Sequence, residues 1–232
     1  MPCLLLALAG PAQAWGTTSR FEVRETNLEP SKSGVVGLLA SALGRGRGER
    51  IDDLADLRMG VRVDAPGWVE RDYQTALGAI RADGTRNDNA VVSRRYYLAD
   101  AAFLVALEGN GHLLKQLAEA VERPRWPLFL GRKAFAPGGP IGRGLHPGDL
   151  SQALAAGGWT DPSLTRTRQL RSHLERGEAI QLRTVLEVSP SEATDFRMDQ
   201  PLSSADRSFA RRGVQLGSIS LSLTMLPREH AR

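Results

Sequence analysis

The chain has 232 residues, 41% of them hydrophobic and 24% charged, with a formal net charge of +4. This composition is typical of a globular protein with a sizeable core, and it excludes a chain that is disordered throughout. The single cysteine excludes an internal disulfide and a zinc site built on cysteines, and it favours a reducing cytoplasm. Only three of the thirty basic residues are lysines. This arginine bias suits nucleic-acid binding, and a GC-rich genome is the alternative explanation.

An apolar run at residues 4–9 has the length of a core strand, and Cys3 beside it is expected to be buried. The run also imitates a secretory signal, because residues 12–14 (Ala-Gln-Ala) look like a cleavage site. However, no basic residue precedes Arg20, and the run is too short for a signal core or for the roughly 20 residues of a membrane span. We therefore predict a first core strand and no contact with a membrane.

The next element is a helix predicted at residues 35–43, where apolar side chains repeat at helical spacing. Serines on both sides of Lys32 can cap this helix, the lysine adds a positive charge, and small residues leave backbone amides open. The pattern predicts a phosphate site at the helix start, and an ordinary capped helix is the alternative. A nucleotide-binding P-loop is excluded, because that motif needs a glycine where the chain has Asn27.

Two more strands and a helix follow. Residues 59–63 alternate between apolar and polar side chains like a half-buried strand, residues 101–107 indicate a more buried strand, and residues 112–121 have helical spacing. The order strand, helix, strand, strand, helix is most of a ferredoxin-like βαββαβ unit, the topology of RNA-recognition sheets. We therefore predict an α+β fold.

Residues 66–89 form a polar, glycine-bearing insertion between the two middle strands. An insertion of this length in a compact domain is usually functional or an arm that docks elsewhere, and disorder is the alternative. We predict a ferredoxin-like domain at residues 1–136 that carries this arm. Residues 137–232 are then a glycine- and proline-rich loop and a small β-rich subdomain that completes the fold.

The last third begins with glycines and prolines at residues 137–148, which mark a loop or a subdomain boundary. A strand is predicted at residues 180–188, followed by a basic loop at residues 206–212. A final strand is predicted at residues 218–225, where apolar side chains alternate with serine and threonine.

Basic and aromatic residues alternate in one segment that contains Arg94, Arg95, Tyr96 and Tyr97. Bases of single-stranded nucleic acid stack on tyrosine rings and on guanidinium planes, so this segment is a candidate RNA contact. One tyrosine of the adjacent pair is expected to point inward, because neighbours in a strand face opposite sides.

No metal site is predicted, because the four histidines are far apart in the chain and lack partners at ligand spacing. Metal-free RNA cleavage remains open, because a tyrosine, lysine or histidine beside a 2′-hydroxyl can act as general acid or base. The available groups for such a reaction are Tyr73, Tyr96, Tyr97, His112 and His146, and loss of cleavage on mutation of Tyr73, Tyr96 or His112 would identify it.

These segments together resemble the type I-E form of the Cas-five family of CRISPR-associated proteins, which belongs to the RAMP superfamily. The resemblance runs through nearly the whole chain in the order of the family. It is carried by residues 4–16 (LLLALAGPAQAWG), Phe21, residues 30–44 (PSKSGVVGLLASALG), 71–77 (RDYQTAL), 93–107, 127–133 (PLFLGRK) and 207–212 (RSFARR).

The resemblance implies a non-catalytic subunit of the cytoplasmic Cascade complex that binds and caps the 5′ handle of the CRISPR RNA. Residues 66–89 would be a thumb that reaches the first backbone subunit, the large subunit would be a further neighbour, and target DNA would be met only through the complex. No cofactor and no metal are implied. Family members of subtype I-C cut the repeat RNA, so a metal-independent endoribonuclease is the runner-up, and a general RNA-binding module is a third possibility.

Lys32→Glu is expected to weaken handle binding while leaving folding intact. By motif position, the resemblance implies two sets of contacts. The thumb contacts are Arg71, Tyr73, Thr75 and Leu77. The RNA contacts are Arg20, Phe21, Lys32, Ser33, Gly34, Arg94, Arg95, Tyr96, Arg132 and Lys133.

Overall fold

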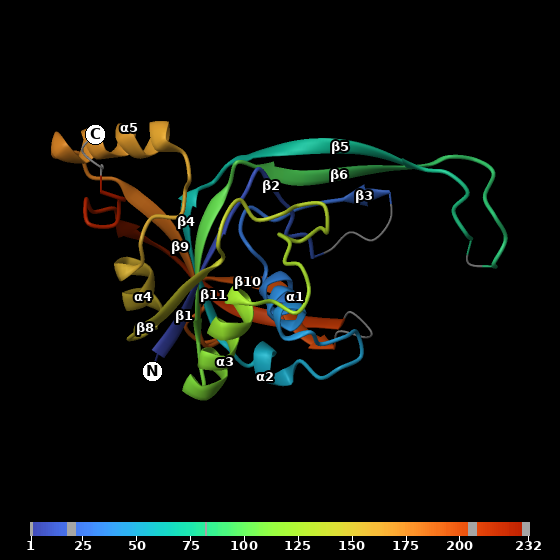
Figure 1. Ribbon diagram of the computed structural model, residues 1–232, viewed down its shortest axis with the longest axis horizontal. Coiled ribbons are helices and arrows are strands. Elements are labelled where there is room, and N and C mark those ends of the chain that lie inside the picture. The colour runs from blue at the N-terminus through green and yellow to red at the C-terminus, as the bar shows by residue number, and fades with distance from the viewer. Residues whose placement is uncertain (1, 18–21, 82, 204–207, 229–232) are drawn as a thin grey trace.

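The computed structural model describes residues 2–17, 22–81, 83–203 and 208–228. Seven strands form its main sheet: β1 (Pro2–Ala9), β4 (Arg58–Ala65), β7 (Ala102–Glu108), β8 (Gly142–Pro147), β9 (Gln181–Glu187), β10 (Asp195–Ser203) and β11 (Ser208–Ser220). Their order across the sheet is β10-β11-β9-β4-β7-β1-β8, and each neighbouring pair is antiparallel (Figure 1). The first strand of the chain therefore lies inside the sheet.

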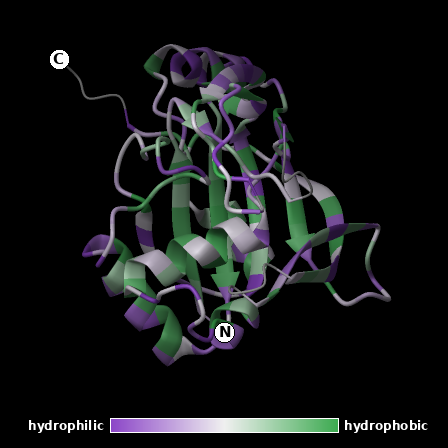
Figure 2. Cartoon of the chain, turned by 90° about the vertical axis from the view of Figure 1, so that its right-hand side faces the viewer, coloured by the Kyte–Doolittle hydropathy of each residue, from purple (hydrophilic) through white to green (hydrophobic). Residues whose placement is uncertain are grey.

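Helices cover both faces of the central strands. One face packs against α1 (Lys32–Leu43) and α3 (Gly111–Glu122), and the other packs against α4 (Leu150–Ala156). Alternate residues of β1 join the two cores, with Leu6 in the first and Leu5 in the second. Because both of its faces are buried, β1 is a continuous apolar run rather than an alternating one. Figure 2 shows the hydrophobic residues gathered on these central strands.

Two further helices lie at the margins of the sheet. The short α2 (Asp52–Ala55) packs beside α1, and α5 (Leu164–Glu175) covers a third small core that contains Trp159, Leu182 and Met225. None of the helices in the described ranges combines the length and the apolar character needed to cross a membrane.

A buried arginine connects the sheet to α4 and to the segment that follows it. The Arg62 side chain has no exposed surface, and its Nε lies 2.6 Å from the carboxylate of Asp64. Its remaining N–H groups donate to the backbone oxygens of Leu154, Gly157 and Gly158 at 2.5–2.8 Å. A charge this deeply buried is tolerated only when it is paired and hydrogen-bonded, and here both conditions are met.

A second sheet contains β2 (Ala12–Gln13), β3 (Val23–Arg24), β5 (Trp68–Ala76) and β6 (Val91–Ala99). β5 and β6 are nine residues long and pair along their full length. At about 3.3 Å per residue, this hairpin extends about 30 Å, and it projects from the body of the protein (Figure 1).

Six of the predicted elements are confirmed, and so is the α+β class. The confirmed elements are the strands at residues 4–9, 59–63, 101–107 and 180–188, seen as β1, β4, β7 and β9, and the helices at residues 35–43 and 112–121, seen as α1 and α3.

Other expectations were wrong in part. The strand predicted at residues 218–225 ends at Ser220, because Leu221 and Met225 turn under α5 into the third core. Residues 208–212 of the predicted basic loop belong to β11, and residues 206 and 207 lie outside the described ranges. The glycine-rich stretch at 137–148 contains the edge strand β8, and α4, α5 and β10 were not predicted.

Candidate nucleic-acid interface

The start of α1 does not present the phosphate site that its sequence predicts. Ser31 caps the helix, and its Oγ accepts the backbone N–H of Gly34 at 3.3 Å. The backbone N–H of Lys32 donates to the Asp199 carboxylate on β10 at 2.8 Å. A carboxylate is the anion that a helix N-terminus favours, so the protein itself supplies the negative charge.

The Lys32 side chain is also directed inward. Only 2% of it is exposed, and its Nζ lies 2.8 Å from Oε1 of Glu187. Burial lowers the pKa of Lys32, and the nearby Glu187 opposes that shift. Arg212 completes the network with two hydrogen bonds of 2.9 Å to Asp199. Lys32 therefore belongs to a neutral buried network of two acids and two bases, which corrects the expectation that its ammonium faces a ligand.

The opposite side of α1 is open. Gly37 is exposed, and a Cβ built on it would meet no atom within 4 Å in the described structure. Small residues continue along this face to Ala40 and Ser41, where a larger side chain would fill the space. They form the floor of a depression that we call the α1 groove.

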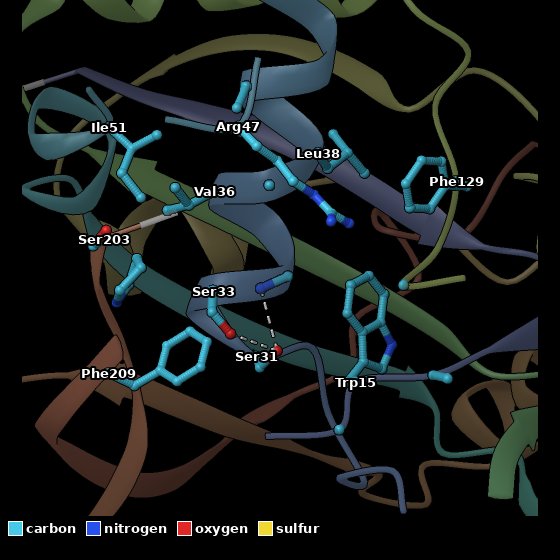
Figure 3. Close-up of a pocket in the computed structure, with 17 residues that line it drawn as sticks. Trp15, Ser31, Ser33, Val36, Leu38, Arg47, Ile51, Phe129, Ser203 and Phe209 are labelled. Carbon is cyan, nitrogen blue, oxygen red and sulfur yellow. Dashed lines mark hydrogen bonds between the residues drawn. The ribbon is translucent and has the colours of Figure 1, made fainter. Parts of the chain in front are cut away.

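The α1 groove has two connected chambers. The inner chamber, of about 350 Å³, lies between α1 and the rings of Trp15, Phe129 and Phe209 (Figure 3). The outer chamber, of about 860 Å³, is bounded by Trp126 and Lys133. Phe129 lines both chambers, so they form one continuous surface. Volumes of this size accommodate small ligands or individual nucleotides.

Basic side chains line this groove. Arg47 lines both chambers, and Lys133 lines the outer one. Within the described residues, neither side chain forms an ion pair or a hydrogen bond. Arg45 differs, because Asp53 binds it through both carboxylate oxygens at 2.6 and 2.7 Å. The groove therefore combines an apolar, aromatic floor with two uncompensated positive charges.

The basic segment of β6 lies on the hairpin, next to the loop that carries Arg132. The Arg132 Nη2 group donates to the backbone oxygen of Tyr96 at 2.6 Å. Tyr97 turns toward the body of the protein, where its ring lies 5.5 Å from that of Phe135. Arg94 is exposed on the other side of the strand. The structure thus brings Arg95, Tyr96 and Arg132 together.

The predicted thumb residues are exposed along β5 and just beyond it. Arg71 lies opposite Tyr96 in the antiparallel pair, and Tyr73 lies opposite Arg94, so these four residues share one face of the hairpin. Tyr73 is 63% exposed, and Leu77, which follows the strand, is 78% exposed. Thr75 is exposed on the same strand.

Several residues complete the account of the predicted sites. Ser33 and Gly34 line the inner chamber of the groove, so both are near the open surface although Lys32 is not. Arg20 and Phe21 lie outside the described residues. Arg47 belongs to the basic run of Arg45, Arg47 and Arg50 after the predicted helix, but it was not among the predicted RNA contacts.

Aromatic residues of the groove were also missed. Trp126 and Phe129 occur in a basic, proline-bearing loop, which was the available signal, whereas Trp15 and Phe209 come from distant segments.

The groups considered for RNA cleavage are not gathered at one place. His112 lines a separate cavity of about 410 Å³ beside α3, whereas Tyr73 and Tyr96 lie on the hairpin. Within the described ranges, no group of three or more histidine, cysteine, aspartate or glutamate side chains is arranged to hold a metal ion.

The sequence matches the family described as CRISPR-associated protein (Cas_Cas5) over residues 3–219. The chain belongs to this Cas-five family. It is 38% identical over 152 residues to the CRISPR system Cascade subunit CasD of Escherichia coli strain K12. That alignment covers 56% of the Cas-five chain and 65% of CasD, slightly less than two thirds of the relative.

Solved structures resemble the Cas-five chain over nearly its full length. A crystal structure of a Cas protein is 38% identical, with a TM-score of 0.71, and the match covers 94% of this chain and 95% of that one. A chain of a CRISPR RNA-guided surveillance complex is 30% identical, with a TM-score of 0.80, covering 96% and 92% respectively. The sequence match to the family and the structural matches therefore lead to the same assignment, and the chain has a mixed α+β fold.

Proposed function

We propose that this chain is a non-catalytic subunit of a type I-E Cascade complex that binds and caps the 5′ handle of the CRISPR RNA. Its family, its similarity to CasD and its similarity to a chain of an RNA-guided surveillance complex support this proposal. The observation that carries it is the α1 groove, with its aromatic floor and the uncompensated charges of Arg47 and Lys133.

The chemistry of the groove fits single-stranded RNA. Base faces are apolar and stack on aromatic rings, and the 41% exposed ring of Trp126 is available for stacking. Arg47 and Lys133 can each meet a phosphate. Gly37 lets a base approach the helix backbone, because it has no side chain.

The remaining RNA contacts in this proposal lie on and near the hairpin. They are Arg94, Arg95, Tyr96 and Arg132. Ser33 and Gly34 of the groove are further proposed contacts, and Arg20 and Phe21, which lie outside the described residues, are proposed from their motif position alone. Lys32 has a structural role instead, since its ammonium is paired with Glu187.

The hairpin would be the thumb that contacts a backbone subunit, through Arg71, Tyr73, Thr75 and Leu77. The exposure of Tyr73 and Leu77, together with that of Ile80 and Val91 on the same hairpin, supports this role, because apolar side chains grouped on an exposed surface commonly mark an interaction site. A large subunit would be a second neighbour. Target DNA would be read by guide pairing, while the proteins hold the backbone and shape of the nucleic acid.

The fold supports an assignment to the RAMP type. β1, α1, β4, β7, α3 and β8 follow one another as strand, helix, strand, strand, helix, strand, with α2 inserted before β4. Their strand order β8-β1-β7-β4 is the one that a ferredoxin-like βαββαβ unit requires. We propose that residues 1–136, with the thumb at about 66–89, form this unit together with β8, and that residues 137–232 complete the fold.

The direct test is to co-express the tagged chain with a matching CRISPR array and the other Cascade subunits, and to sequence the RNA that co-purifies. Mature RNA with a uniform 5′ end, present only when a separate processing subunit is included, is expected. Mature RNA without that subunit would make this chain the endoribonuclease. Equal recovery of unrelated single strands would make it a general RNA-binding module.

Variants separate the groove from the thumb. Arg47→Glu with Lys133→Glu is expected to lower the recovered RNA more than tenfold, whereas Arg168→Glu with Arg228→Glu, at two exposed positions that do not line the groove, serves as the charge-matched control. Replacing residues 75–92 by a tight turn is expected to reduce co-purification of the backbone subunit. If the shortened hairpin assembles normally, the thumb assignment is wrong.

A further inference from the structure

Three arginines from separate segments converge midway along the hairpin. Arg24 on β3 lies directly opposite Arg95 in the parallel pair of β3 with β6. Residues directly opposite in neighbouring strands share a face of the sheet, so both side chains leave the same side. Arg132 approaches β6 from the loop after α3 and donates to the backbone oxygen of Tyr96. We call this set the arginine cluster.

Positive charge outweighs negative charge in the cluster, because Asp72, which lies directly opposite Arg95 in the pairing of β5 with β6, faces three guanidinium groups. Within the described residues, none of the three guanidinium groups forms an ion pair. Burial lowers the pKa of Arg132, the positive charges of Arg95 and Arg24 lower it further, and Asp72 opposes them with the smallest effect. Asp72 is itself hydrogen-bonded by Gln74. Three like charges this close together repel one another unless an anion binds between them.

One hydrogen-bond donor of the cluster is also unused. The Nη1 group of Arg132 is buried and has no hydrogen-bond partner in the described part of the chain. A buried donor without an acceptor is costly, and native structures rarely keep one unless a ligand or water supplies the acceptor. An anion in the cluster would supply it.

The position of Arg132 is fixed by its surroundings. Its guanidinium lies 5.3 Å from the centre of the Phe135 ring, and Phe135 in turn packs against Tyr97. The hydrogen bond to Tyr96 holds the other end of the group. Arg132 is therefore pre-positioned, and binding a ligand would cost little side-chain entropy.

We propose that Arg24, Arg95 and Arg132 form a phosphate-binding site that holds a phosphodiester of the RNA strand, separate from the α1 groove. Guanidinium groups bind the two non-bridging oxygens of a phosphodiester in a bidentate manner, and they remain charged at any physiological pH. The loop of residues 129–133 serves both places, because Phe129 and Lys133 line the groove while Arg132 reaches the cluster. The identity of the anion as RNA rests on the proposed function.

The first experiment uses inorganic phosphate as the probe with the full chain. Phosphate, compared with chloride at equal ionic strength, is expected to raise the thermal midpoint of the wild type. Arg24→Ala and Arg95→Ala are expected to lose most of that shift. Their midpoints in chloride are expected to equal or slightly exceed that of the wild type, because each change removes one of the repelling charges. Arg168→Ala, an exposed arginine on α5, is the matched control and is expected to keep the shift.

The second experiment measures the affinity for single-stranded RNA as a function of salt. Each variant is expected to lower the slope of log K against log salt by about 0.7, which corresponds to one lost phosphate contact on a single strand. An equal loss for RNA with a 5′-hydroxyl and with a 5′-phosphate indicates an internal phosphodiester. A loss confined to the 5′-phosphorylated RNA indicates that the site takes a terminal phosphate.

Unchanged phosphate shifts and unchanged salt slopes in both variants would overturn the proposal. A defect only in co-purification of partner subunits would also overturn it, and would assign the cluster to an acidic protein segment. If the variants lose phosphate binding but the wild type shows no preference for repeat RNA, the phosphate site stands and the proposed function fails. If both variants bind repeat RNA with wild-type salt slopes, the proposed function stands and the phosphate site fails.

Discussion

Lys32 shows how a residue with a convincing local pattern can have another role. A lysine between two serines at a helix start is typical of a phosphate ligand. Its ammonium instead contacts Glu187, and its backbone N–H contacts Asp199, which lie 155 and 167 residues further along the chain. Neither acid is recognisable as its partner from the sequence, because only the pairing of distant strands brings them to α1.

Because Lys32 is buried in this network, Lys32→Glu is expected to lower stability rather than to leave folding intact. The substitution puts a third carboxylate beside Glu187 and Asp199 in a buried site, so we expect a loss of about 3–5 kcal/mol in the free energy of unfolding. Urea denaturation measures this loss. Lys133→Glu, at an exposed position, should change the stability by less than about 0.5 kcal/mol. Equal stabilities of the two variants would mean that the Lys32 network is not formed.

Cys3 is a second residue whose environment determines its chemistry. It is fully buried, as its sequence context predicts, and burial followed by the charge of Glu108 raises its pKa to about 11 from the ordinary 9.0. We expect native labelling by a thiol-specific reagent at pH 8 to be at least about 100-fold slower than in urea, because about 100-fold less thiolate is present.

The same shift gives a pH dependence of stability. Because the folded thiol has the higher pKa, the protonated form favours folding. This contribution is complete below pH 9 and is lost as the pH rises towards 11. Cys3→Ser removes the shift and serves as the control. Fast native labelling at pH 8 would show that the N-terminal strand opens.

At the scale of elements, α1 presents two sides with different tasks. One side joins the buried core and the network of Lys32, and the other forms the floor of the α1 groove. The helix ends at Gly44, whose φ of 75° and backbone N–H bonds to Ala40 and Ser41 form a left-handed cap. The sequence predicts this helix well, but it does not show which of its glycines line the groove.

Gly37 allows the two tasks to be separated. Gly37→Leu introduces a side chain into open space and replaces the poorest helix former except proline, so we expect unchanged or slightly higher stability, by up to about 1 kcal/mol. The leucine would occupy the groove, and RNA affinity is expected to fall at least tenfold. Thermal melting and a filter-binding titration measure the two effects.

Gly34 provides the contrasting variant on the same helix. A Cβ at this position would lie 2.8 Å from a ring carbon of Trp15, so Gly34→Ala is expected to lower stability. If Gly37→Leu binds RNA like the wild type, the groove is not the RNA site, whatever the result for Gly34→Ala.

The hairpin marks the limit of prediction from sequence at this scale. An apolar period identifies strands such as β4, whose neighbours bury it, but most residues of β5 are exposed and lack such a period. The arm was therefore expected, whereas its strand was not. The resemblance to the Cas-five family indicated its position, and the register of β5 with β6 determines which of its residues share a face.

At the scale of the whole molecule, the candidate site is less predictable than the fold. The central elements follow from their own local patterns. The groove needs Trp15, Gly37, Trp126 and Phe209, which belong to four separate segments and meet only in the folded chain. Edge elements such as β8 were also missed, since their signal consists of glycines and prolines that equally indicate a loop.

Residues 137–232 contribute to both edges of one sheet, and this gives a whole-molecule prediction. A fragment of residues 1–136 lacks β8, β9 and β11, and with them Val185 and Val214 of the first core. It also lacks both acids that pair with Lys32. We expect this fragment to be aggregated or molten, with poorly dispersed NMR signals, while the full chain unfolds in one cooperative transition. A folded 1–136 fragment would contradict this.

The hydrogen bond between Lys32 and Asp199 also bears on how the protein is made. Ribosomes add about 5–20 residues per second, so about 8–33 seconds separate the synthesis of these two residues. For that time α1 lacks its carboxylate, and the apolar strand β1 lacks much of the core that later covers it. A nascent chain in this state exposes apolar surface that promotes aggregation. Chaperone supply and growth temperature during expression therefore determine how much of it reaches the native fold.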